Sequence, residues 1–170
     1  LDEPATRPEL HARRGHRRVD SPAWAWNLDG KVETVAGVRI AGLGGIFRAR
    51  VWYPPSEPLW YSYSNWEASL EPSWMPERAK ASNAALFSTQ RRTNSSSIFP
   101  VTIDSLAAEQ ADILVTHEAP GAHPLGFHVI DELAEALGVQ RLMHGHHHER
   151  VVYEPTGGRL SFGVDRKSVV

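Results

Sequence analysis

Two short apolar segments separated by a helix-like stretch constrain the fold of this chain most strongly. Residues 112–116 and 139–143 are rich in β-forming side chains, and each is short enough to be a buried strand. Apolar residues recur at helical spacing over 127–137, and Gly138 follows where a helix commonly ends. A strand, a helix and a second strand in this order form a crossover that makes the strands parallel. The sequence therefore predicts an α/β fold.

Two hairpins are predicted on either side of this crossover. From Lys31 to Gly45 the apolar residues are spaced as in a pair of strands, with Ala36-Gly37 as the turn. Residues 150–164 read as a closing hairpin, because Pro155-Thr156-Gly157-Gly158 separates two β-rich segments.

The middle of the chain is less regular. Residues 51–76 hold five prolines and four tryptophans, which favour an irregular loop with short turns over a long helix. We expect a helix around residues 76–90, an exposed polar connection over 90–97 and a short helix over 104–110.

Histidines follow both strands of the predicted crossover. His117 closes the first strand, and four of the nine histidines lie between residues 144 and 148. Because the carboxyl ends of parallel strands meet at one edge of the sheet, we expect both groups to lie close together. In a His-x-His arrangement, side chains two apart can face one volume, and Gly145 permits a tight turn. His117, His146 and His148 are therefore candidate metal ligands.

Such a metal would be bound by nitrogen and oxygen, because the chain contains no cysteine. Neutral imidazole is a frequent ligand of divalent manganese, iron and zinc, and the sequence does not select among them. Glu118 and Glu149 are expected to be solvated side chains, although either could add a carboxylate ligand.

The other histidines have simpler expected roles. His144 and His147 are expected to lie beside the ligands or to be exposed. His123 in a loop and His128 on a helix flank are expected to be ordinary polar residues. His11 and His16 lie in the N-terminal segment, where solvent exposure is expected.

Two segments resemble motifs of the calcineurin-like metallophosphoesterase family. Residues 113–120, Ile-Leu-Val-Thr-His-Glu-Ala-Pro, resemble its fourth motif, and residues 143–148, Met-His-Gly-His-His-His, resemble its fifth, a Gly-His-x-His signature. Residues 37–45 are similar to the strand after its third motif. The resemblance covers roughly residues 28–164 and implies a sandwich of two sheets flanked by helices, with two metals at the sheet edge.

The resemblance also implies an activity and the residues that serve it. His117 and His146 would bind one metal and His148 the other, in a metal-dependent hydrolase of phosphate esters. Such enzymes hold a hydroxide between two metals that also neutralise the phosphate oxygens.

The earlier motifs of the family are not legible in this chain. Its Asp-x-His, Gly-Asp and Gly-Asn-His patterns are missing, and Gly15-His16 stands where the last would be expected. His16 is therefore the candidate catalytic residue. Without a bridging Asp, two adjacent cations would repel each other with little compensation. We expect an incomplete sandwich, the C-terminal half of the family's domain, explained most simply by an N-terminal truncation.

Two non-enzymatic alternatives remain. The chain could be a non-catalytic domain that binds one metal, or a partner through the tryptophan-rich loop. It could also bind single-stranded nucleic acid through the arginines of residues 13–18 and its tryptophans, although the net charge of -2 argues against this. A dinucleotide-binding motif at Gly42-Leu43-Gly44 is excluded, because its third glycine would fall at Phe47.

Composition and length set the organisation we expect. The 170 residues fit one domain, with residues 1–22 as a poorly structured leader and residues 23–170 as the single domain. No apolar run approaches the roughly 20 residues that span a bilayer, so no membrane partner and a cytoplasmic location are expected. The expected partner is a phosphoester substrate.

Overall fold

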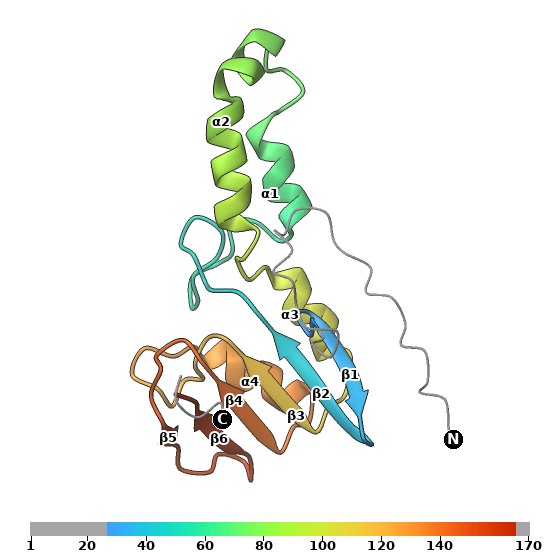
Figure 1. The fold of residues 1–170 in the computed structure, drawn as a ribbon, viewed down its shortest axis with the longest axis vertical. Coiled ribbons are helices and arrows are strands. Elements are labelled where there is room, and N and C mark those ends of the chain that lie inside the picture. The colour runs from blue at the N-terminus through green and yellow to red at the C-terminus, as the bar shows by residue number, and fades with distance from the viewer. Residues whose placement is uncertain (1–26, 166–170) are drawn as a thin grey trace, which may run out of the picture.

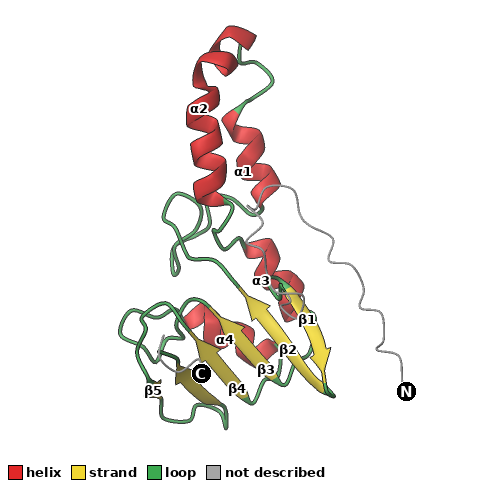
Figure 2. Ribbon diagram, in the orientation of Figure 1, coloured by secondary structure: helices red, strands yellow, loops and turns green. Residues whose placement is uncertain are grey.

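The computed structural model describes residues 27–165, which form a mixed α/β fold (Figure 1). A six-stranded sheet carries helices on one face, and two further helices project from one end of the molecule (Figure 2). The α/β expectation is confirmed. The leader over residues 1–22 and the candidate catalytic residue His16 lie outside the described residues.

The sheet is parallel at its centre and antiparallel at both edges. Its strands are β1 (Lys31–Val35), β2 (Val38–Leu43), β3 (Ile113–Thr116), β4 (Arg141–His144), β5 (Val151–Val152) and β6 (Leu160–Gly163). They are ordered β1-β2-β3-β4-β6-β5. Strands β2, β3, β4 and β6 run parallel, while β1 and β5 pair antiparallel with their neighbours.

Two helices cover one face of this sheet. The helices are α1 (Tyr63–Leu70), α2 (Glu77–Asn94), α3 (Pro100–Ala107) and α4 (His128–Ala136). Leu114 of β3 and Leu142 of β4 are fully buried in one cluster with Ile103 of α3 and with Ile130 and Leu133 of α4. This cluster is the main core. None of the helices within residues 27–165 is long and apolar enough to cross a membrane.

The predicted crossover is confirmed as β3, α4 and β4. The last residues of its strands, Thr116 and His144, lie side by side in the ladder. Gly138 ends the helix with φ +70°, a conformation that favours glycine. Strand β4 begins two residues later than expected, because the amide of Val139 bonds to the helix carbonyl of Ala134 instead of a strand.

Both predicted hairpins are confirmed. Ala36 and Gly37 have positive φ, as a tight two-residue turn between β1 and β2 requires. Strands β5 and β6 pair antiparallel, and Gly157 and Gly158 have positive φ in the turn that joins them.

The expectation of an irregular loop over 51–76 is wrong over α1. Ser62 begins this helix by accepting a hydrogen bond from the amide of Asn65. Trp66 is buried in a second cluster with Val51 and Phe99. The prolines and tryptophans of this segment gave no helical pattern, because α1 is stabilised by the packing of Trp66 rather than by its own helix propensity.

The other two middle elements differ from expectation in their bounds. Helix α2 extends to Asn94, which is buried, so the exposed connection predicted from residue 90 is wrong up to that point. Arg91 of α2 donates to Glu67 at 3.0 Å and to Glu71 at 2.6 Å, which ties this end of α2 to α1. Helix α3 begins at Pro100 because proline fits the first turn of a helix.

The helical arm formed by α1 and α2 leaves and rejoins the sheet at adjacent points. The amide of Ile46 donates to the carbonyl of Ser96 at 2.9 Å, and the amide of Ile98 donates to the carbonyl of Ile46 at 3.1 Å. Figure 1 shows α1 and α2 projecting away from the strands.

Candidate functional site

Two of the three predicted metal ligands meet at the carboxyl edge of the sheet. The His117 amide donates to the carbonyl of Leu43, the last residue of β2, and the Gly145 amide donates to the carbonyl of Thr116, the last residue of β3. These backbone contacts bring the loops after β3 and β4 together. As a result, Nε2 of His117 lies 2.8 Å from Nδ1 of His146.

This separation suits either a hydrogen bond or a shared cation. A hydrogen bond requires one ring to donate its N–H and the other to accept it. When both nitrogens are unprotonated, the same lone pairs can bind one metal ion. The 2.8 Å separation of the two nitrogens would therefore allow His117 and His146 to hold one divalent metal ion together.

The backbone around His146 adopts an uncommon conformation. The amide of His147 donates to the carbonyl of Gly145 at 2.7 Å, and His146 between them has φ +58°. A bond across three residues with a positive φ at the centre is a γ-turn of the rare type. His148 also has a positive φ, of +55°. Strained non-glycine residues of this kind cluster at functional sites.

The third predicted ligand does not join the pair. His148 is exposed, and among residues 27–165 it makes no hydrogen bond or ring contact with His117 or His146. Within the same range, no three His, Cys, Asp or Glu side chains are grouped so that they could hold a metal ion. The described part of the chain therefore supplies a histidine pair.

A second group of histidines lies behind the pair. His123 is only 8% exposed and stacks on His147, with ring centroids 4.0 Å apart and planes 15° apart. His144 is fully buried, and its Nε2 lies 2.8 Å from the hydroxyl of Tyr153. His123 lies in a loop as predicted but is buried there, whereas the side chain of His128 at the start of α4 is 88% exposed.

The burial of His123 follows from a closed loop that sequence patterns do not reveal. The amide of His123 donates to Pro120, that of Gly126 donates to His123, and that of Phe127 returns to Ala119. These bonds fold residues 119–127 back on themselves. Neither His123 nor Tyr153 carries a periodic signal, so only the long-range contacts identify them.

The neighbouring carboxylates are directed elsewhere. Glu118 is 5% exposed and accepts a hydrogen bond from the amide of Phe47 at 3.1 Å, so the expectation that it is solvated is wrong. Glu149 is 67% exposed in its side chain and lies 3.9 Å from Nε2 of His123. Within residues 27–165, neither carboxylate makes a hydrogen bond or an ion pair with His117 or His146, although the charge of Glu118 raises the pKa of His117.

The surroundings favour the neutral form of three imidazoles. Partial desolvation of the His117 ring, which stays exposed at the sheet edge, lowers its pKa below the ordinary 6.5. The neighbouring His146 lowers this pKa further, and the charge of Glu118 opposes the shift. Burial also lowers the pKa of His144, although the carbonyl of Gly145 opposes this, and lowers the pKa of His147 with His123 as the next cause. Neutral imidazole is the form that binds metal ions.

These lowered pKa values predict acid sensitivity of the metal-free protein. Below pH 6.5 the unfolded chain binds protons at His117, His144 and His147 before the folded chain does, so stability is lost as pH falls. We expect the Tm, measured in the presence of a chelator, to be lower at pH 5 than at pH 7.5. A His144→Gln variant should show a smaller Tm difference between the two pH values. An unchanged difference would contradict the assignment to His144.

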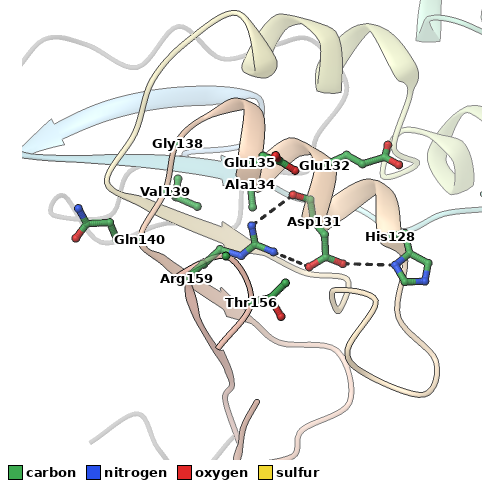
Figure 3. A pocket seen from close by; sticks show the side chains of 12 residues that line it. His128, Asp131, Glu132, Ala134, Glu135, Gly138, Val139, Gln140, Thr156 and Arg159 are labelled. Carbon is green, nitrogen blue, oxygen red and sulfur yellow. Dashed lines mark hydrogen bonds and ion pairs between the residues drawn. The ribbon is translucent and has the colours of Figure 1, made fainter. Parts of the chain in front are cut away.

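The described pockets lie away from the histidine pair. A cavity of about 550 Å³ lies beside α4 and is lined by the turn before β6 (Figure 3). In it, the guanidinium of Arg159 donates to Oδ1 of Asp131 at 2.8 Å. Neither His117 nor His146 lines this cavity.

Comparison with known proteins adds one relative. The chain is 42% identical over 127 residues to an uncharacterized protein of Haemophilus influenzae, an alignment that covers 75% of this chain and 52% of the relative. The chain thus spans about half the length of the curated relative it matches. No family model matches the sequence.

Proposed function

We propose that this chain is part of a metal-dependent hydrolase of phosphate esters of the calcineurin-like metallophosphoesterase family. His117 and His146 would bind one divalent metal and His148 a second. The most direct support is the 2.8 Å distance between Nε2 of His117, in the loop after β3, and Nδ1 of His146, in the loop after β4. Both loops lie at the carboxyl edge of the strands, where ligands bind in parallel sheets.

The residues present suit such a role. The lowered pKa of His117 keeps its ring neutral near pH 7. Its Nε2 faces Nδ1 of His146 at the solvent-exposed edge, where a phosphoester has access. Bound manganese, iron or zinc would supply Lewis acidity and an activated water. His117 and His146 would hold and orient that ion.

The sheet also supports the sandwich that the family implies. The face opposite α3 and α4 includes Val38, Val115 and Leu160, which are 38%, 39% and 38% exposed. Parallel strands are usually covered on both faces. We propose that this face packs against a second sheet in the complete domain.

Metal binding is the first test of the proposal. Purified protein would be loaded with Mn²⁺ or Zn²⁺, desalted and subjected to elemental analysis, beside His146→Asn and His117→Asn variants. Asparagine removes the imidazole at residue 146 while tolerating its positive φ. We expect bound metal in the wild type and its loss in both variants. His128→Asn, which changes an exposed histidine, is the matched control.

Turnover is the second test. Hydrolysis of a chromogenic phosphoester with excess Mn²⁺ is expected to depend on His117 and His146 in any form of the protein that is active. Activity that survives both substitutions would exclude the proposed site. Wild-type protein that retains no metal would exclude the ligand assignment.

A second candidate function is metal binding without catalysis. The contacts of Glu118 and Glu149 favour it. Glu118 accepts from the amide of Phe47 and Glu149 lies 3.9 Å from His123, so neither bonds to the histidine pair as the negative ligand that would separate two cations. Stoichiometric metal without phosphoester hydrolysis, even in excess Mn²⁺, would support this candidate over the first.

A further inference from the structure

We propose that Tyr153 and His144 are positioning residues for the His117–His146 pair. The hydroxyl of Tyr153 fixes the ring of His144, and that ring fixes the turn that directs His146 toward His117. The effect on metal affinity rests on the proposed function, whereas the effect on the geometry of the pair does not.

The proton positions of this network follow from its partners. Nδ1 of His144 lies 3.2 Å from the carbonyl oxygen of Gly145, which can only accept a hydrogen bond. Nδ1 therefore carries the proton. Nε2 of the neutral ring is then an acceptor, so the hydroxyl of Tyr153, 2.8 Å away, is the donor. The orientation of the ring is defined at both nitrogens.

This network acts on the strained turn at His146. The Gly145 carbonyl accepts from the His147 amide, which closes the γ-turn, and from the ring of His144. The Gly145 amide donates to Thr116 at 3.2 Å. Strained conformations persist only where several contacts define them together. His144 supplies one of these contacts from the interior, where it is 1% exposed and water does not replace it.

Gly163 of β6 leaves the space that the network needs. A methyl group at Gly163 would lie 3.1 Å from Nε2 of His144 and 2.7 Å from the carbonyl oxygen of Glu149. Next to it, the amide of Val164 donates to the carbonyl of His144 at 2.9 Å. The end of β6 thus packs against His144, and a larger residue at position 163 would displace the ring of His144.

The role of the Tyr153 hydroxyl can be separated from that of its backbone. The amide of Tyr153 donates to the carbonyl of Ser161 at 3.1 Å, so the main chain stays attached to β6 when only the hydroxyl is removed. Tyr153→Phe is therefore a minimal change. Tyr61→Phe is the matched control. It also removes a tyrosine hydroxyl, which donates to Asp104 at 2.7 Å and, among residues 27–165, makes no hydrogen bond with His117, His144 or His146.

The experiment combines imidazole NMR with a zinc titration. In metal-free protein, long-range ¹H–¹⁵N spectra should show His144 protonated at Nδ1. In Tyr153→Phe, we expect the Nε2 signal of His144 and the facing nitrogens of His117 and His146 to shift. With Zn²⁺, we expect the affinity to fall about 10-fold, as for other changes around metal ligands. Tyr61→Phe should leave both readouts at their wild-type values.

The outcomes distinguish the proposal from its alternatives. Unchanged His117 and His146 signals in Tyr153→Phe would overturn the positioning role, even if Tm fell. Shifted signals in a protein that binds no Zn²⁺ would support positioning while rejecting the proposed function. His144→Gln supplies the same readouts at His117 and His146 if the tyrosine variant does not fold.

Discussion

A Gly126→Ala protein is expected to be less stable than the wild type by about 3 kcal/mol or more. A methyl group at Gly126 would lie 1.8 Å from the carbonyl oxygen of Pro120, a backbone atom that cannot rotate away. The loop over residues 119–127 would have to open, although its own hydrogen bonds and the burial of His123 depend on its closure. For a chain of this size, the expected fall in Tm is roughly 6–12 °C.

Gly145→Ala is the control for this substitution. Its new methyl group would meet only Nδ1 of His117, at 4.0 Å, and Gly145 does not have a positive φ. We expect its chemical denaturation midpoint to stay near that of the wild type. A Gly126→Ala protein with the same midpoint as Gly145→Ala would show that the loop adjusts freely at Pro120.

The second large effect is expected for Asp131→Ala, at about 3 kcal/mol of destabilisation. Asp131 of α4 accepts from Arg159 through Oδ1 at 2.8 Å (Figure 3). It also accepts from the amide of Gly121 through Oδ2 at 2.7 Å. The side chain of Arg159 is 8% exposed and its Nε has no partner within the described residues. Removal of Asp131 would leave this buried cation uncompensated. The 26% exposure of Asp131 places the estimate at the lower end of the range for buried pairs.

A double-mutant cycle tests whether the buried charge causes this loss. Arg159→Met removes the cation while retaining much of its apolar volume. We expect Asp131→Ala combined with Arg159→Met to be more stable than the sum of the single substitutions predicts, in urea unfolding. Strict additivity would mean that Asp131 stabilises the fold through Gly121 rather than through Arg159.

The sequence predicted the part of the fold that local patterns encode. Strand β3, helix α4 and strand β4 were predictable because the apolar residues of 112–143 repeat at strand and helix spacing and Gly138 ends the helix. Both hairpins were marked by their turn residues. Helix α1 was not predicted, because its stability comes from the burial of Trp66 against residues distant in sequence.

The candidate site was predictable to a similar depth. His117 follows β3 and His146 follows β4, and these two strands are parallel neighbours. The direction of the strands alone therefore predicts that the two histidines meet at one edge of the sheet. The inward direction of Glu118 and the stacking of His123 depend on the packing of Phe47 and on loop closure. Neither has a local sequence pattern. The participation of Tyr153 likewise depends on long-range strand pairing, because β6 lies between β4 and β5 in the sheet and Tyr153 follows β5.

The adjacent hydrogen bonds between Ile46, Ser96 and Ile98 bear on how this chain can change in length. Because the backbone enters and leaves the helical arm at one place, the residues between these points form a closed loop within the connection from β2 to β3. A doubling of such a loop costs only about 0.6 kcal/mol in closure entropy. The alignment of β2 with β3 is therefore insulated from the length of the arm, and insertions or deletions near its tip leave the edge that carries His117 and His146 in register.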